Sequence, residues 1–193
     1  MNAPAEAGHL PGWQTLLHAI DAEADPLLRR NLTVVAEHVV AEVEGDLEAL
    51  MDTLVEQPRY GFWGCTTSVG PVGAVAVREH YTRMFVSGKN RLDFLIGRVV
   101  ADRDAVVTEG TFRLAYPGSA LVVATAESGE AVDPGGWYLI EYRAVVLWPI
   151  RDGLLEGEDL YVGEVPRVLR ALADGEHPEL GPVGRRNGSV PAW

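Results

Sequence analysis

Apolar residues recur at helical spacing through the first part of the chain. Residues 13–23 carry them on one side, at Trp13, Leu16, Leu17 and Ile20. Asp25 followed by Pro26 is a helix-start signal, because the aspartate caps the first turn and proline fits there. The helix that begins here is predicted to run to about residue 43, with its apolar stripe at Leu28, Leu32, Val35, Val39 and Val43.

The next segments continue the helical region. Gly45 breaks the long helix, and Asp46 is predicted to cap a further helix that ends before Pro58. Residues 59–64 are short and aromatic, which favours a strand. Residues 72–85 return to helical spacing, with a buried side predicted at Val77, Tyr81, Met84 and Phe85.

Alternation of apolar and polar residues replaces the helical pattern after about residue 90. It predicts strands at residues 91–101, 105–115, 139–150 and 154–162. Asp102-Arg103-Asp104 is predicted to be a turn, and Asp152-Gly153 is a hairpin signal. Helices first and long strands afterwards indicate an α+β fold, in which N-terminal helices pack on a strongly curved mixed or antiparallel sheet.

The remaining segments carry weaker patterns. Residues 116–137 are punctuated by glycine and proline and fit either a strand with a loop or a lid, and residues 164–172 are predicted to form a final short helix. The chain is therefore divided into an N-terminal extension with a short helix (1–24), one main domain (25–172) and a C-terminal tail (173–193).

Composition narrows the class of protein. The chain has 193 residues, of which 47% are apolar, and this suits one domain with a substantial core. Its net charge of −12 comes without a cluster of lysine and arginine, so we expect no nucleic-acid binding. Cys65 is the single cysteine, the first twelve residues do not resemble a signal peptide, and no apolar run approaches a membrane span. A cytoplasmic location is the resulting expectation.

Four segments, taken together in their order and spacing, resemble one known family. They are HVVAEVEGDLEAL from His38, PRY from Pro58, VREHYTRMF from Val77 and DGLLEGEDLY from Asp152. They are similar to segments of the nuclear transport factor 2-like superfamily, especially its SnoaL-like branch, over about residues 25–172. The resemblance implies a cone that admits a small apolar ligand, and a homodimer packed through the outer face of the sheet. Its members include isomerases, dehydratases, epoxide hydrolases, polyketide cyclases and plain binding domains, so the fold alone does not choose a function.

The resemblance also implies which residues of this chain occupy the catalytic positions of known family members. At the tyrosine position of ketosteroid isomerase-like sites this chain has His38, and the position of their general base falls at Gly61 or Phe62. Tyr60 matches the tyrosine of limonene epoxide hydrolase-like sites. The other positions of that set fall at Phe62, Gly110, Phe112 and Leu160, so neither of these two reactions is expected.

For two further chemistries of the family, this chain has candidate catalytic residues. Scytalone dehydratase-like sites combine histidines with tyrosines, which His38, Tyr60 and His80 could supply, although the helix pattern favours a surface position for His80. SnoaL-like cyclases use an acidic pocket residue, for which Glu158 is the best-placed candidate. His38, Tyr60 and Glu158 are therefore the predicted catalytic residues.

Each candidate also has a purely structural interpretation. His38 lies at the edge of the apolar stripe, so it is either an acid–base imidazole or a satisfied border histidine. Tyr60 is either a pocket donor or a core tyrosine. Glu158 falls on the inward face by parity, as does Arg98. The two either neutralise each other, or Glu158 acts as acid or base, or the strand ends at a solvated rim.

Further side chains are predicted to bind the ligand. Glu42, one turn beyond His38, could orient the imidazole or simply be part of the helix surface. Trp63, Phe112, Tyr142 and Trp148 are predicted wall residues, and Arg98 is included because of its inward parity. A third ligand for a metal beside His38 and Glu42 is not evident, so no metal site is expected.

Three functions remain open at this point. The first is a cofactor-free lyase, isomerase or cyclase that acts on an apolar oxygenated molecule such as a polyketide, steroid or terpenoid. The second is a non-catalytic module that binds a hydrophobic ligand. The third is a dimeric scaffold whose cone is filled by its own side chains.

Overall fold

The computed structural model describes residues 12–64, 69–90, 92–119, 121 and 131–173. Cys65, the N-terminal residues 1–11, residues 122–130 of the predicted strand or lid, and the predicted tail from residue 174 lie outside the described residues. The expectations for these segments therefore stay predictions.

Four helices are formed close to the predicted positions. They are α1 (Gln14–Ala22), α2 (Pro26–Glu44), α3 (Leu47–Asp52) and α4 (Ala74–Val86). The Asp25 carboxylate accepts a hydrogen bond from the Leu27 amide at 2.8 Å, and the Asp46 carboxylate accepts one from the Ala49 amide at 3.0 Å. Both predicted N-caps are therefore confirmed.

The strands form one mixed sheet. They are β1 (Gly61–Gly64), β2 (Leu92–Ala101), β3 (Ala105–Pro117), β4 (Trp137–Arg151), β5 (Leu154–Leu155), β6 (Asp159–Val162) and β7 (Arg167–Leu172). The order along the sheet is β1-β6-β4-β3-β2, with β5 and β7 also paired to β4. The β1–β6 pair is parallel and the others are antiparallel. Together with the helices, this sheet confirms the predicted α+β fold.

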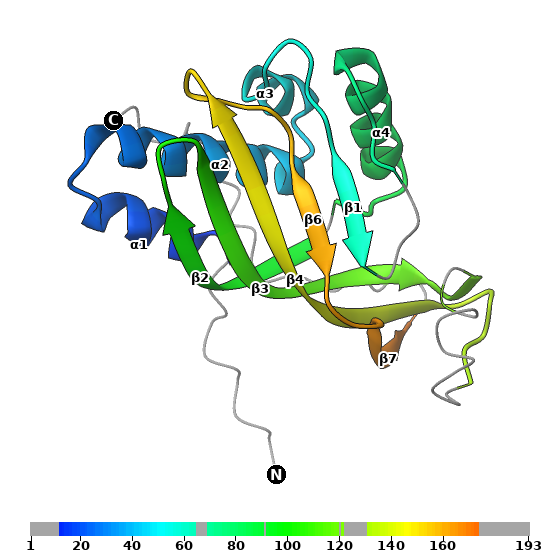
Figure 1. The fold of residues 1–193 in the computed structure, drawn as a ribbon. Helices are drawn as coiled ribbons and strands as arrows, with labels where there is room; N and C mark the ends of the chain where they lie inside the picture. The colour runs from blue at the N-terminus through cyan, green and yellow to red at the C-terminus, as the bar shows by residue number, and fades with distance from the viewer. Residues whose placement is uncertain (1–11, 65–68, 91, 120, 122–130, 174–193) are drawn as a thin grey trace.

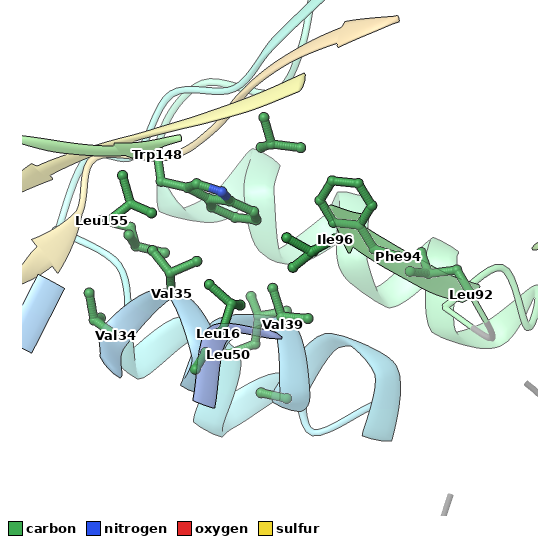
Figure 2. Close-up of a cluster of buried hydrophobic side chains, with 14 of the residues drawn as sticks. Leu16, Val34, Val35, Val39, Leu50, Leu92, Phe94, Ile96, Trp148 and Leu155 are labelled. Carbon is green, nitrogen blue, oxygen red and sulfur yellow. The ribbon is translucent and has the colours of Figure 1, made fainter. Parts of the chain in front are cut away.

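The helices lie on one side of the sheet, and the long strands β3 and β4 bend along their length (Figure 1). Even-numbered residues of β3 and β4 face the helices, as the alternation predicts, and most of them are buried. Val35 and Val39 of α2 point toward Trp148 of β4 and Ile96 of β2 (Figure 2). Leu16 and Ile20 of α1 belong to the same core.

The structure contradicts two predictions, one about which side chains of a strand face inward and one about a short helix. The alternation in β2 predicts that Arg98 and Val100 face inward, but a bulge between Ile96 and Arg98 adds one residue to the strand. Beyond the bulge Val99 faces the core, Val100 is 54% exposed, and Arg98 pairs with Glu109 on the outer face.

The second wrong prediction is the short helix at residues 164–172. Residues 167–172 instead form β7, which pairs with the first part of β4 from Trp137 to Glu141. The arginine, leucine and alanine residues of this segment favour a helix locally. Pairing with β4 overrides that preference, because β4 begins earlier than predicted and offers a free edge there.

Candidate functional site

His38 is placed in the interior by α2, where no part of it is exposed. Its Nδ1 lies 2.7 Å from the Thr53 hydroxyl, and its Nε2 lies 3.1 Å from the Tyr81 hydroxyl. The Trp148 ring packs edge-on against the imidazole at 5.7 Å. Both ring nitrogens therefore have partners. Burial lowers the pKa of His38 to about 3, so the imidazole is neutral near pH 7.

Tyr60 and Tyr81 complete a cluster with His38. The Tyr60 hydroxyl lies 3.5 Å from His38 Nε2 and 3.2 Å from the Tyr81 hydroxyl. Both tyrosines are only 1% exposed. Burial is the main reason that the pKa of each phenol rises well above its ordinary value. We call His38, Tyr60 and Tyr81 the histidine–tyrosine cluster; the structure brings His38 and Tyr60 together as predicted, but encloses both.

Glu158 comes to this cluster through strand pairing. Gly61 pairs with Asp159, so the preceding residues Tyr60 and Glu158 are neighbours, and the Gly61 amide donates to the Glu158 carbonyl at 2.8 Å. On the other side, Asp159 pairs with Leu147, which places Glu158 beside Trp148.

Gly157 allows this close approach. Its φ is +127°, and a Cβ atom there would lie 1.9 Å from the Arg59 carbonyl oxygen. The chain can therefore turn between β5 and β6 against the segment that carries Tyr60 only because residue 157 is glycine. Glu158 follows directly, and its position depends on this turn.

Glu42 and Glu158 are half-buried acidic residues near this cluster, and we call them the carboxylate pair. Glu42 lies one helical turn beyond His38 on α2. Neither side chain makes a hydrogen bond or an ion pair with any other part of the chain that the structure describes. Both keep some accessible surface, although protein surrounds them. Their charges are therefore uncompensated in a desolvated place.

Burial raises the pKa of both carboxyls, and the charge of Glu42 adds to the shift of Glu158. Burial raises the pKa of Glu42 to about 7. Burial, followed by the charges of Glu42 and Asp159, raises the pKa of Glu158 well above its ordinary value of 4.5. Two carboxylates that repel each other in this way cannot both be ionised at neutral pH, so at least one keeps its proton.

Aromatic side chains from the sheet face the same interior. The rings of Phe94 and Phe112 stack at 4.1 Å, and those of Phe112 and Tyr142 at 5.5 Å. Burial, followed by the charges of Tyr116, Glu42 and Glu158, raises the pKa of the Tyr142 phenol. Phe112, Tyr142 and Trp148 therefore face inward as predicted. The Trp148 indole is nearly fully buried and donates to the Thr108 hydroxyl at 2.9 Å.

Two of the predicted ligand-binding residues, Trp63 and Arg98, do not belong to this site. Trp63 is 49% exposed on the outer face, where it stacks on Tyr161 and donates to the Asp159 carboxylate at 3.2 Å. Its inward placement is wrong because Phe62, its neighbour in the strand, takes the inner face opposite Leu160. The predicted inward placement of Arg98 is wrong because of the β2 bulge, and its pairing with Glu158 does not occur.

His80 differs from its predicted placement, and two residues that contact His38 are absent from the predicted site. His80 is half-buried rather than on the helix surface, and its ring lies 5.4–6.5 Å from those of Tyr60, Phe62 and Tyr81. Tyr81 and Thr53 contact His38 but are not among the predicted site residues. The sequence predicts that Tyr81 is buried, and a buried phenol needs a hydrogen-bond partner, which is a reason to include it among site candidates. No feature of the sequence points to Thr53.

Within the described ranges, no three His, Cys, Asp or Glu side chains gather as a metal ion would require. No helix in those ranges has both the length and the apolar character needed to cross a bilayer.

Comparison with known proteins identifies the fold of the chain. No protein-family model matches the sequence, and no curated protein matches it significantly. A solved SnoaL-like polyketide cyclase from Jannaschia sp. CCS1 is 17% identical with a TM-score of 0.54, over 72% of this chain and 90% of that one. Another, from Shewanella putrefaciens CN-32, is 15% identical with a TM-score of 0.55, over 84% and 92%.

A third similar structure comes from an enzyme of a different description. The epoxide hydrolase/cyclase-like enzyme SalBIII, described by its role in pyran ring formation in the polyether salinomycin, is 16% identical with a TM-score of 0.52, over 72% of this chain and 96% of that one. At these identities the comparisons establish the fold. The chain has the nuclear transport factor 2-like fold of SnoaL-like proteins, as its sequence segments predict.

Proposed function

We propose that the protein is a cofactor-independent acid–base enzyme, an isomerase, lyase or cyclase that acts on an apolar oxygenated molecule such as a polyketide, steroid or terpenoid. The carboxylate pair is the observation that carries this proposal. Glu42 and Glu158 are half-buried, lack a cationic partner among the described residues and raise the pKa of the inward-facing Tyr142. Perturbed acids of this kind concentrate at functional sites.

The pair provides an acid and a base in one place. When one carboxyl is ionised, the repulsion between the two keeps the other protonated. The ionised carboxylate removes a proton from a carbon next to a carbonyl, and the electron pair moves to the carbonyl oxygen. The protonated carboxyl or the Tyr142 phenol donates a hydrogen bond to that oxygen. Return of the proton at another carbon gives isomerisation. Attack of the enolate carbon on a second carbonyl, whose oxygen takes the proton from the carboxyl, gives cyclisation.

Names of the structural neighbours agree with this class of chemistry. Two are described as polyketide cyclases and one as an epoxide hydrolase/cyclase-like enzyme. These names support the choice of a small organic substrate. They do not select the reaction for this chain, because unrelated activities share the fold.

Turnover of neutral ketones tests the proposal. The assay uses a β,γ-unsaturated steroid ketone, followed by the absorbance of the conjugated product, and a linear poly-β-keto ester, followed by chromatography. Glu42→Gln and Glu158→Gln should each lower kcat by about 10²–10⁴-fold, since each removes a proton-transfer group. Glu44→Gln, an exposed change on the same helix, should leave kcat unchanged. Equal rates in all variants would remove the assignment.

A binding module without catalysis is the second candidate. The burial of the histidine–tyrosine cluster favours it over catalysis by these residues, because His38 and Tyr60 have hydrogen-bond partners and almost no accessible surface. In that case the ketones should raise the melting temperature and be recovered unchanged, at one molecule per chain.

A further inference from the structure

Thr53 makes two short hydrogen bonds whose directions are fixed by chemistry. Its hydroxyl donates to the Leu50 carbonyl at 2.6 Å, and it lies 2.7 Å from His38 Nδ1. A carbonyl oxygen only accepts hydrogen bonds, so the single proton of the hydroxyl is used there. The contact with His38 must then have Nδ1–H as the donor and the threonine oxygen as the acceptor.

This direction determines whether the other ring nitrogen, Nε2, donates or accepts a hydrogen bond. A neutral histidine has one N–H, so with the proton on Nδ1 the Nε2 atom carries only a lone pair. Nε2 faces the hydroxyls of Tyr81 at 3.1 Å and Tyr60 at 3.5 Å. One tyrosine must donate to it. If the nearer Tyr81 hydroxyl donates, the Tyr60 proton points either to the Tyr81 oxygen or toward the neighbouring Glu158. If Tyr81 instead donates to the Tyr60 oxygen at 3.2 Å, Tyr60 donates to Nε2.

We propose that Thr53 is a positioning residue, which fixes the tautomer of His38 and thereby orders the hydroxyl protons of Tyr81 and Tyr60. The effect on chemistry rests on the proposed function, in which Tyr60 stands beside the acid–base residue Glu158. His38 in this arrangement is a hydrogen-bond acceptor for the tyrosines and does not itself contact the substrate. Thr53 lies at the C-terminal end of α3, so this short helix has a role in setting the site.

Nitrogen-15 NMR of histidine-labelled protein tests the proposal without a substrate. In the wild-type protein, His38 should show a protonated Nδ1 and a bare Nε2. Thr53→Ser keeps the hydroxyl and should keep this tautomer. Thr53→Val removes the acceptor, and the Nε2–H form should appear. Thr33→Val is the matched control, since the exposed Thr33 hydroxyl also donates to a carbonyl of its own helix. It should leave the His38 signals unchanged.

Two spectra would overturn the inference. One is a wild-type His38 with its proton on Nε2, and the other is a Thr53→Val protein that is folded by circular dichroism and keeps Nδ1–H. Thr53→Ser shows whether the hydroxyl, rather than the volume of the side chain, is responsible, because it must behave as wild type.

Kinetics separates this inference from the proposed function. If a ketone is turned over, Thr53→Val should lower kcat about tenfold with KM unchanged, the effect of one hydrogen bond, and Thr53→Ser should restore it. A tautomer change in Thr53→Val without turnover by any variant would support the positioning role and contradict the proposed enzyme. A loss of kcat with an unchanged tautomer would overturn the positioning role and leave the enzyme assignment standing.

Discussion

His38 and Glu42 lie one turn apart on α2, and burial moves their pKa values in opposite directions. The imidazole is charged when it holds the proton, so burial lowers its pKa to about 3. The carboxyl is charged when it loses the proton, so burial raises its pKa to about 7. Both shifts favour the neutral form. The two residues therefore have opposite effects on stability as pH changes.

The signs follow from linkage between protonation and folding. The folded pKa of Glu42 exceeds its unfolded value of 4.5, so its contribution is lost as pH rises through about 7. The folded pKa of His38 lies below its unfolded value of 6.5, so its contribution is lost as pH falls from there toward 3. Between these limits both groups are neutral in the folded protein, and together they reduce the free energy of unfolding least.

Glu42→Gln should stabilise the protein at pH 8, because it removes the cost of an ionised, buried carboxylate. We expect a gain in the free energy of unfolding of about 1–3 kcal/mol at pH 8 and almost none at pH 4, measured by urea denaturation. The exposed change Glu44→Gln should stay within about 0.5 kcal/mol of wild type at both pH values. A Glu42→Gln protein no more stable than wild type at pH 8 would show that Glu42 is well solvated.

At the scale of single elements, the bulge in β2 decides which side chains reach the core. The extra residue is Gly97, after which Val99 rather than Val100 faces inward. A matched pair of substitutions tests this. Val99→Asp should lower the free energy of unfolding by about 2–4 kcal/mol, since it buries a charge, whereas Val100→Asp should change it by less than about 1 kcal/mol. The reverse order, measured by chemical denaturation, would mean that β2 continues without a bulge.

The elements that could be predicted from sequence are those with local signals. Asp25 and Asp46 cap helices through bonds within their own first turn, and Asp152-Gly153 forms its hairpin with both φ angles positive. The strand β7 had no such signal, because its partner lies in the first part of β4. The bulge at residue 97 also has no local marker beyond a glycine.

The candidate site was predictable in part for the same reason. His38 and Glu42 share one helix, and Glu158 follows from parity along a strand. Tyr81 and Thr53 reach His38 from α4 and α3, and only tertiary packing sets those distances. Trp63 was misplaced because the alternation within a strand of four residues does not reveal which face is buried.

At the scale of the whole molecule, the outer face of the sheet is the surface predicted to pair two copies of the chain. Trp63 and Tyr161 stack there, and Tyr161 is 45% exposed. Exposed aromatic residues are typical of interfaces. We predict a homodimer in sedimentation equilibrium, which Tyr161→Glu should convert to monomer. Val86→Glu, an exposed change on α4, should leave the mass unchanged. A wild-type protein that sediments as a monomer would contradict this prediction.

The proposed chemistry depends above all on the carboxylate pair, and carbon-13 NMR of glutamate-labelled protein measures the titration of both carboxyls directly. Two carboxyl signals should titrate near or above pH 7, well separated from the other glutamates, and replacing Glu42 with glutamine should lower the pH at which Glu158 titrates. If every glutamate carboxyl in the wild-type protein titrates near its ordinary value of 4.5, the interior holds no desolvated acid pair and the proposed chemistry has no base.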